Sequence, residues 1–571
     1  MSGPRDCLYE PVQLVAPQLR VGILLDAPKA ERWVRSILTD IQEAPFTQIA
    51  LVVLNDEASA PPPRRSGAGM WAAHLEGQMF WQYAKRDQRN QRNGSVLTHT
   101  DVADLLAEVP RLQVRPARKG FVHRFADEDL AAIQEHDLDV LLRFGFNVLR
   151  GGILHAARHG VWSFHHGDNS AYRGGPAMFW EIAERNPVTG TILQVLTDEL
   201  DGGEVIYRSW GATGRSMWMS ASREPLYRKA SPFVIRCLRQ LYQRGGEPLP
   251  VEAPGAKGRL YRKPTNAQMA PFLARAALRS LRSRIANRLG QEEWFLAYRH
   301  EREKFVTNTA RVDMSGFVPM RPPAHEFWAD PFVLKHEGTD HVFFERYDRQ
   351  AGRGDIWTFA FDAAGRPGSM RPVLSLSHHL SSPFVFEWEG AAYMVPESAE
   401  ARTVSLYRAT RFPDGWEHVC DLLSGVAVVD ATLFEHEGRW YLFANASEDG
   451  GPLDDELFLF HAETPLGPWR PHPMNPIKSD VRSARPAGRI FRRGGVLIRP
   501  SQDCSVRYGY AINLCEIRAL SPTAYEERVI DRITPDWLPG LMCCHTINAT
   551  DTVEVVDARR RAGKGWRSLR A

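Results

Sequence analysis

Polar and ionisable residues gather in the stretch VWSFHHGDNSAYRGGP, which runs from Val161 to Pro176. It holds two adjacent histidines, an aspartate and an arginine, and it follows the apolar run DVLLRFGF, which is typical of a buried strand. Ligands of parallel sheets bind beyond the carboxyl ends of the strands. We therefore expect a binding or catalytic loop here.

A second set of ionisable residues recurs in the C-terminal half, close to short aromatic strands. The set comprises Asp330 in WADPFV, Glu397 in VPES, Asp430 in VVDATLF, Arg485 in SARPAGR and Asp503 in RPSQDCS. Two carboxylates across a sugar ring can act as acid and base. Acidic residues at strand starts can equally form turns. Sugar binding, glycoside hydrolysis and turn structure all remain open for this set.

Two sequence textures predict the elements that position these residues. Between Leu19 and Arg244, buried apolar runs alternate with helical patterns, which predicts an α/β domain with a mostly parallel, Rossmann-like sheet. Beyond residue 300, five similar units follow one another at intervals of 47 to 60 residues, marked by Asp330, Pro383, Asp430, Pro486 and Thr546. This period predicts a five-bladed β-propeller. We expect domains at 1–245 and 301–571, joined by a linker at 246–300.

The linker contains a predicted basic helix. Leu278, Leu281, Ile285 and Leu289 recur at helical spacing, with arginines around them. Packing between the domains is the simplest interpretation, and a patch for RNA or an anionic membrane is the alternative.

Composition gives no general reason to expect a nucleic-acid partner, because 71 basic residues face 68 acidic ones. Seven scattered cysteines are typical of a reducing compartment, and no run approaches the length of a membrane span. We expect a cytoplasmic protein without a membrane partner, and its oligomeric state cannot be read from the sequence.

His155 and His159 lie four residues apart, but no third ligand is evident, so no metal is expected.

The N-terminal region resembles the folate-dependent formyltransferases. Their pattern is Asn-x-His, then Tyr-Arg-Gly, Thr-Gly and Leu-Asp-x-Gly. Here His165, the run 172–174, the pair 189–190 and the run 200–203 stand at these positions. The resemblance covers about residues 19 to 245 and implies an enzyme that moves a formyl group from 10-formyltetrahydrofolate to the amine of a small-molecule acceptor.

The resemblance also implies residue roles. His165 stabilises the oxyanion, and Asp201 orients the histidine and assists proton movement. Ser163 stands where the family has its first catalytic residue, an asparagine. Three alternatives remain open for the hydrogen bond that the asparagine donates to the oxyanion. Ser163 donates a weaker one, or Asn169 or His166 supplies the donor, or formyl transfer has been lost. The pterin slot and the acceptor site complete the expected set. The slot comprises Phe144, Gly145 and Phe146, and the acceptor site comprises His166, Asp168, Asn169, Asp330, Asp430 and Arg485.

The C-terminal half resembles the propellers of glycoside hydrolases and, more closely, the propeller domain of glucosamine inositolphosphorylceramide transferases. In the hydrolases the acid follows both aspartates, whereas Glu397 lies between Asp330 and Asp430, so a binding role fits better. The main hypothesis is a formyltransferase whose propeller recognises the acceptor. The alternative is a carbohydrate-binding or glycoside-processing protein whose formyltransferase-like domain has lost transfer.

Overall fold

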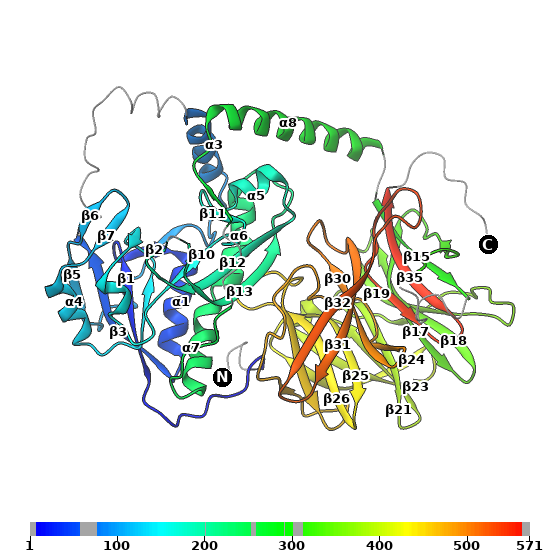
Figure 1. The fold of residues 1–571 in the computed structure, drawn as a ribbon. Coiled ribbons are helices and arrows are strands. Elements are labelled where there is room, and N and C mark those ends of the chain that lie inside the picture. The colour runs from blue at the N-terminus through cyan, green and yellow to red at the C-terminus, as the bar shows by residue number, and fades with distance from the viewer. Residues whose placement is uncertain are drawn as a thin grey trace. The chain divides into compact units, whose positions relative to one another are not determined.

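The computed structural model describes residues 7–56, 77–199, 201–252, 258–289, 292–300 and 312–561 (Figure 1). The chain divides into two compact units, one formed by residues 12–280 and the other by residues 1–11 and 281–571. We call them the α/β unit and the propeller unit. Among the described helices, none is both long and apolar enough to cross a membrane.

The α/β unit is built on a seven-stranded sheet. In spatial order its strands are β13 (Glu204–Ala212), β12 (Val188–Val195), β10 (Val161–His165), β8 (Val140–Arg143), β1 (Leu19–Leu25), β3 (Thr47–Asn55) and β5 (Arg111–Val114). The five strands from β10 to β5 are parallel, and β12 and β13 continue the sheet antiparallel. The predicted mostly parallel sheet is confirmed.

Both faces of this sheet are covered, which explains the continuous apolar runs of its strands. Val21 and Ile23 of β1 face a core shared with two helices, whereas Leu24 faces the core on the other side. The helices of the unit are α1 (Arg32–Glu43), α3 (Gln78–Arg89), α4 (Asp127–Gln134), α5 (Phe179–Glu184), α6 (Met219–Ala230), α7 (Phe233–Gln243) and α8 (Asn266–Leu289), with the 3-10 turn η2 (Gly152–His155). Helices α1 and α7 cover the first face, and α4 and η2 cover the second.

Short strands pair outside the main sheet. They are β2 (Lys29–Glu31) with β4 (His99–Asp101), β7 (Val122–Arg124) with β6 (Ala117–Lys119) and β9 (Val148–Leu149), and β11 (Tyr172–Gly174) with β14 (Arg259–Tyr261). The β11–β14 pair fixes the chain beyond the sequence-predicted loop, because residues 172–174 lie in register with residues 259–261.

The propeller unit contains four antiparallel sheets that are continuous in sequence. Their strands are β17 (Glu326–His336), β18 (Thr339–Asp348), β19 (Arg353–Ala360) and β20 (Arg371–Leu374); β21 (Ser381–Trp388), β22 (Ala391–Glu397), β23 (Thr403–Arg411) and β24 (Gly415–Ser424); β25 (Val428–His436), β26 (Arg439–Ala446), β27 (Leu457–Ala462) and β28 (Arg470–Pro471); and β29 (Phe491–Arg493), β30 (Val496–Asp503), β31 (Ala511–Leu520) and β32 (Tyr525–Ile533).

A fifth sheet closes the circle with strands from both ends of the unit. It contains β15 (Glu292–Arg299), β16 (Val318–Met320), β33 (Leu541–Cys543), β34 (Ile547–Ala549) and β35 (Glu554–Arg561). Strand β15 pairs antiparallel with β35, from Glu292 opposite Arg561 to Arg299 opposite Glu554. This pairing joins the first strand of the unit to the last. Each predicted repeat unit corresponds to one sheet, so the five-bladed β architecture is confirmed as a propeller-like fold.

The first strand of three sheets carries the same irregularity. Register shifts occur at Ala329/Phe332 in β17, at Ser381/Phe384 in β21 and at Val429/Thr432 in β25. Each bulge holds a non-glycine residue in the left-handed region, with φ of 52° at Asp330, 41° at Ser382 and 52° at Asp430. Bulges of this kind re-aim a side chain, and left-handed non-glycine residues are concentrated at functional sites.

The N-terminal segment contributes to the propeller unit's core. Leu8 is fully buried in a cluster with residues of β17, β21 and β25, and Tyr9 donates a hydrogen bond of 2.6 Å to Glu448.

We predict that Leu8→Ala destabilises the propeller unit by about 2–5 kcal/mol, because it removes buried methyl groups and leaves a cavity. Urea unfolding followed by tryptophan fluorescence measures this change. Val15→Ala is the control, since Val15 is 83% exposed and its truncation should leave the unfolding curve in place. Equal curves for both variants would contradict the docking of this segment.

Candidate functional site

The predicted histidine–aspartate pair of the α/β unit is brought together. His165, at the end of β10, places its Nδ1 3.6 Å from Asp201 Oδ1, and its Nε2 lies 3.1 Å from the carbonyl oxygen of Tyr172. Asp201 has a φ of 52° and accepts a hydrogen bond of 2.8 Å from the N–H of Gly174. The loop and the Asp201 turn therefore hold each other in place.

Ser163 faces a buried arginine and not an open site. Its side chain is 1% exposed, and its Oγ accepts a hydrogen bond of 3.0 Å from Arg143 Nε. Burial lowers the pKa of Arg143, and the nearby Asp201 and Asp26 oppose that effect. The hydroxyl of Ser163 is thus engaged by this guanidinium inside the protein.

The other candidates of the loop also have internal partners. Asn169 Oδ1 accepts a hydrogen bond of 3.0 Å from Arg208, and Asp168 lies 3.4 Å from the same arginine while capping Ser170. His166 stacks on Tyr227 with ring centres 3.7 Å apart. Burial, and secondarily His165, lower the pKa of His166 to about 3, so it is a neutral packing residue here.

The expected pterin slot is filled by protein. Phe146 is fully buried and packs against Phe125 with ring centres 5.3 Å apart, so it does not line a slot. A Cβ on Gly145 would lie 2.6 Å from the backbone nitrogen of Asp26, so the glycine serves a close approach within the protein. Phe144 packs edge-on against Trp33.

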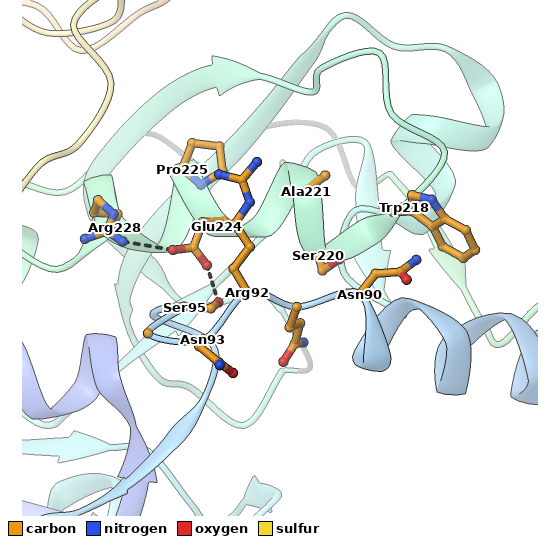
Figure 2. Close-up of a pocket in the computed structure, with 12 residues that line it drawn as sticks. Asn90, Arg92, Asn93, Ser95, Trp218, Ser220, Ala221, Glu224, Pro225 and Arg228 are labelled. Carbon is orange, nitrogen blue, oxygen red and sulfur yellow. Dashed lines mark hydrogen bonds and ion pairs between the residues drawn. The ribbon is translucent and has the colours of Figure 1, made fainter. Parts of the chain in front are cut away.

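A separate cleft of 630 Å³ opens on the α/β unit between the end of α3 and the start of α6 (Figure 2). Trp218 forms one wall and stacks on Tyr83, while Asn90 and Asn93 contribute amides. Glu224 crosses the floor, where it accepts hydrogen bonds from Ser95 and from Arg228. The cleft is large enough for a small polar ligand, and sequence reasoning did not find it, because its residues come from segments about 130 positions apart.

The propeller unit gathers three residues of the second predicted set into one buried cluster. Arg485 Nε lies 2.5 Å from Asp430 Oδ2, and its Nη2 lies 3.8 Å from Glu397 Oε2. Gln502 Nε2 donates a further hydrogen bond of 3.0 Å to Asp430 Oδ2, and the Asp430 N–H donates one of 3.2 Å to Glu397. The three predicted residues Glu397, Asp430 and Arg485 thus form one hydrogen-bonded group.

Asp330 belongs to an adjoining chain of charges. Its Oδ1 accepts a hydrogen bond of 2.9 Å from Thr546 Oγ1 and lies 3.6 Å from His545 Nε2. The other ring nitrogen of His545 lies 2.6 Å from Asp557 Oδ2. The order aspartate, histidine, aspartate places one imidazole between two carboxylates.

The same three residues have ligand atoms within 4.8 Å of one another, a spacing that could hold a metal ion. Asp557 is already occupied, however, because its oxygens accept the N–H groups of Asp330, His545 and Thr546 as well as the imidazole. We therefore interpret the trio as an internal ion-pair network. The other metal candidate, the pair His155 and His159, is not on one helix: His155 ends η2 and His159 follows in a turn, so the two share no helical face.

Burial sets the protonation of the cluster. Burial raises the pKa of Glu397 to about 8, with the charge of Asp430 adding to the effect. Burial also raises the pKa of Asp330 to about 6 and that of Glu345, on the neighbouring strand β18, well above its usual range. Burial opposes protonation of His545, but Asp557 and Asp330 outweigh it and raise its pKa. At neutral pH, Glu397 is a proton donor next to the carboxylate of Asp430.

One aromatic ring marks where the cluster reaches solvent. Arg485 stacks over the ring of Tyr508 at 4.8 Å, and Tyr508 is 40% exposed. The Glu397 side chain keeps 12% of its surface exposed. A ligand at this surface would meet an aromatic face and a charged cluster together.

Sequence reasoning found Asp330, Glu397, Asp430 and Arg485 but missed their partners. His545 is adjacent to the repeat marker Thr546, which was the available signal. Glu345, Gln502 and Asp557 carry no local signal, because each is an ordinary strand residue until the circle closes. Asp503, which the sequence analysis also singled out, pairs with Arg532 on β32 and not with the cluster.

Comparison with known proteins locates the resemblance in the propeller unit. Residues 312–534 match the family model described as glucosamine inositolphosphorylceramide transferase 1, N-terminal. The protein of that name from Oryza sativa subsp. japonica is 37% identical over 246 residues, which cover 42% of this chain and 32% of the relative. The Arabidopsis thaliana protein is 36% identical over 228 residues, covering 39% and 29%. The chain thus spans about a third of the length of these relatives.

Two solved structures illustrate the fold likenesses. A family 117 glycoside hydrolase from Zobellia galactanivorans is 14% identical, with a TM-score of 0.31, over 47% of this chain and 90% of that one. Glycinamide ribonucleotide transformylase 1 from Symbiobacterium toebii is 16% identical, with a TM-score of 0.27, over 43% and 99%. Scores this low carry no conclusion about activity.

These findings correct the main functional hypothesis. The relatives are named as transferases of glucosamine, so formyl transfer, the formyltransferase assignment and 10-formyltetrahydrofolate as cofactor are all wrong on this evidence. The cytoplasmic expectation is also overturned, because the relatives are named for a ceramide acceptor, which is a membrane lipid. The alternative hypothesis, a carbohydrate-handling propeller, fits better.

The raised pKa of Glu397 predicts a pH-dependent stability. The folded protein holds this proton up to about pH 8, whereas an unperturbed glutamate releases it near pH 4.5, so ionisation costs stability as the pH rises through that window. Glu397→Gln removes this cost. We expect the variant to gain stability relative to wild type between pH 5 and pH 8, by up to about 1.4 kcal/mol per pH unit.

Thermal unfolding at a series of pH values measures this difference. Glu389→Gln, in the exposed turn between β21 and β22, is the matched control and should follow wild type throughout. Parallel curves for Glu397→Gln and wild type would show that Glu397 is not protonated in the fold.

Proposed function

We propose that the propeller unit binds a carbohydrate at the Asp430–Arg485–Glu397 cluster and prefers an amino sugar. The observation that carries the proposal is the convergence of buried carboxyl groups on a single arginine beside the exposed ring of Tyr508. Proteins bind sugars through planar polar groups that accept hydrogen bonds from the sugar hydroxyls and donate hydrogen bonds to them. An aromatic ring commonly packs against the apolar face of the sugar.

Charge favours an amino sugar over a neutral one. Five acidic side chains, Asp330, Glu345, Glu397, Asp430 and Asp557, gather around one arginine, Arg485, and one histidine, His545. The cluster therefore has an excess of acidic groups. An ammonium group on the ligand would balance it, and charge-assisted hydrogen bonds are the stronger kind. Glucosamine, the sugar in the relatives' name, has this group.

We expect glucosamine to bind more tightly than glucose or N-acetylglucosamine, since neither of these carries the cation. Asp430→Asn should weaken glucosamine binding about tenfold or more through the loss of a charge-assisted contact. Titration calorimetry with the full chain measures each affinity. Asp362→Asn, in the exposed turn that follows β19, is the control for the same substitution and should bind like wild type.

A second variant guards against unfolding, because removing one partner of a buried ion pair is strongly destabilising. Tyr508→Ala truncates an uncharged side chain that is 40% exposed, so it should weaken all three sugars while costing less stability than Asp430→Asn, and the melting temperature of each variant is measured beside its affinity. Absence of binding heat for every sugar would refute the proposal, and equal affinity for glucosamine and N-acetylglucosamine would refute the charge preference.

The protonated Glu397 supports glycoside processing as a second candidate. A carboxyl group with a raised pKa beside a carboxylate is the arrangement that lets one group act as acid while the other stays ionised. In this role Glu397 would protonate the departing oxygen of a glycoside.

For this second candidate, Glu397→Gln should lower the turnover of a phenyl glucosaminide by about 10²- to 10⁴-fold and spare a dinitrophenyl glucosaminide, whose leaving group needs no proton. Release of the phenol is measured by absorbance. If wild type releases neither phenol, this second candidate is refuted, and calorimetry alone decides whether the cluster binds sugars.

A further inference from the structure

Helix α8 is anchored to the α/β unit by one apolar face. Met269, Phe272 and Ala276 are buried, and the first two pack with Phe80 and Tyr83 of α3. The N–H of Met79 on α3 donates a hydrogen bond of 2.9 Å to Asn266 at the start of α8. Figure 1 shows α3 beside this end of the helix. The first half of α8 is therefore held in place.

The same helix carries a second apolar row that is bare. Leu278, Leu281 and Ile285 are 55%, 55% and 49% exposed. Their spacing of three and four residues puts them on one face, and at 3.6 residues per turn that face points away from Phe272 and Ala276. The row is thus not part of the packing that anchors α8.

Cations surround this row without acidic partners. No aspartate or glutamate occurs between Glu252 and Glu292, a segment with nine basic residues. Arg275, Arg282 and Arg284 are exposed, and among the described residues they form no ion pair. Burial lowers the pKa of Arg279, and the neighbouring cations Arg185 and Arg275 lower it further. The crowding of like charges favours an anionic partner.

An exposed aromatic ring extends the surface at the start of the helix. Trp81 of α3 is 57% exposed, and Lys263 lies over its ring at 5.2 Å. Tryptophan and basic side chains are the residues that anchor proteins at the headgroup level of membranes.

From these features we propose that α8 docks the protein on an anionic membrane surface. The row Leu278, Leu281 and Ile285 enters the headgroup boundary, while the arginines contact lipid phosphates. A nucleic acid would use the arginines but leave the aliphatic row in water. The proposal revises the sequence-based expectation of no membrane partner, and it does not rest on sugar binding by the propeller unit.

Sedimentation of the full chain with vesicles tests the proposal. Wild type should pellet with phosphatidylcholine vesicles that contain phosphatidylserine and stay in the supernatant with phosphatidylcholine alone. Leu278→Ser with Leu281→Ser and Ile285→Ser should weaken binding to the anionic vesicles about tenfold or more, and so should Arg275→Gln with Arg279→Gln and Arg282→Gln. Ser280→Ala with Ser283→Ala is the matched control on the same helix and should bind like wild type.

Three outcomes would overturn the proposal. The first is that wild type stays in the supernatant with anionic vesicles. The second is that wild type binds RNA while the serine variant of the aliphatic row retains full affinity for vesicles. A lower melting temperature for that variant would show that the row is covered by protein and not by lipid. Since the glucosamine titration uses other residues, its result is independent of all three.

Discussion

Three backbone N–H groups in the propeller unit donate their hydrogen bonds to carboxyl groups from a neighbouring sheet. The bulges at Asp330, Ser382 and Asp430 take these groups out of their strand ladders, and each donates instead across to the next sheet. Asp430 donates to Glu397, Ser382 to Asp330 and Asp330 to Asp557. A buried N–H without an acceptor is costly, so the bulges and the carboxylates require each other. The links run from sheet to sheet and join four of the five sheets in a row, from the sheet of β35 through those of β17 and β21 to that of β25.

This requirement creates the electrostatics of the cluster. Carboxylates placed to accept backbone N–H groups are buried beside one another, and burial penalises each charge. The fold meets that cost with one arginine, one histidine and raised pKa values of the Glu345 and Glu397 carboxyl groups. Because these groups are fixed by the backbone, a ligand meets a field that needs no reorganisation. The polar centre is therefore required by the fold itself, apart from any ligand.

The sequence predicted residues that recur at the starts of repeating units. It missed residues whose contacts form only when the fifth sheet closes the propeller unit. Asp330, Asp430 and Arg485 could be found because they stand near the starts of repeating units, and His165 and Asp201 because ordered motifs surround them. Asp557 could not be found, since its value as an acceptor arises only when β35 pairs with β15. Ser163 was placed correctly on a strand end, but no pattern shows that Arg143 occupies its hydroxyl. Phe146 was misjudged because its positive φ turns the ring into the core.

The charge of the whole chain does not reveal its basic segment. The chain has a formal charge of +3, yet nine basic and no acidic residues lie between Glu252 and Glu292, so the rest of the chain is net negative. An anionic surface would attract this segment and repel the remainder. This charge distribution would orient the protein as well as attract it, because only α8 is favoured at an anionic surface. The charge asymmetry and the bare aliphatic row on α8 therefore favour the same contact.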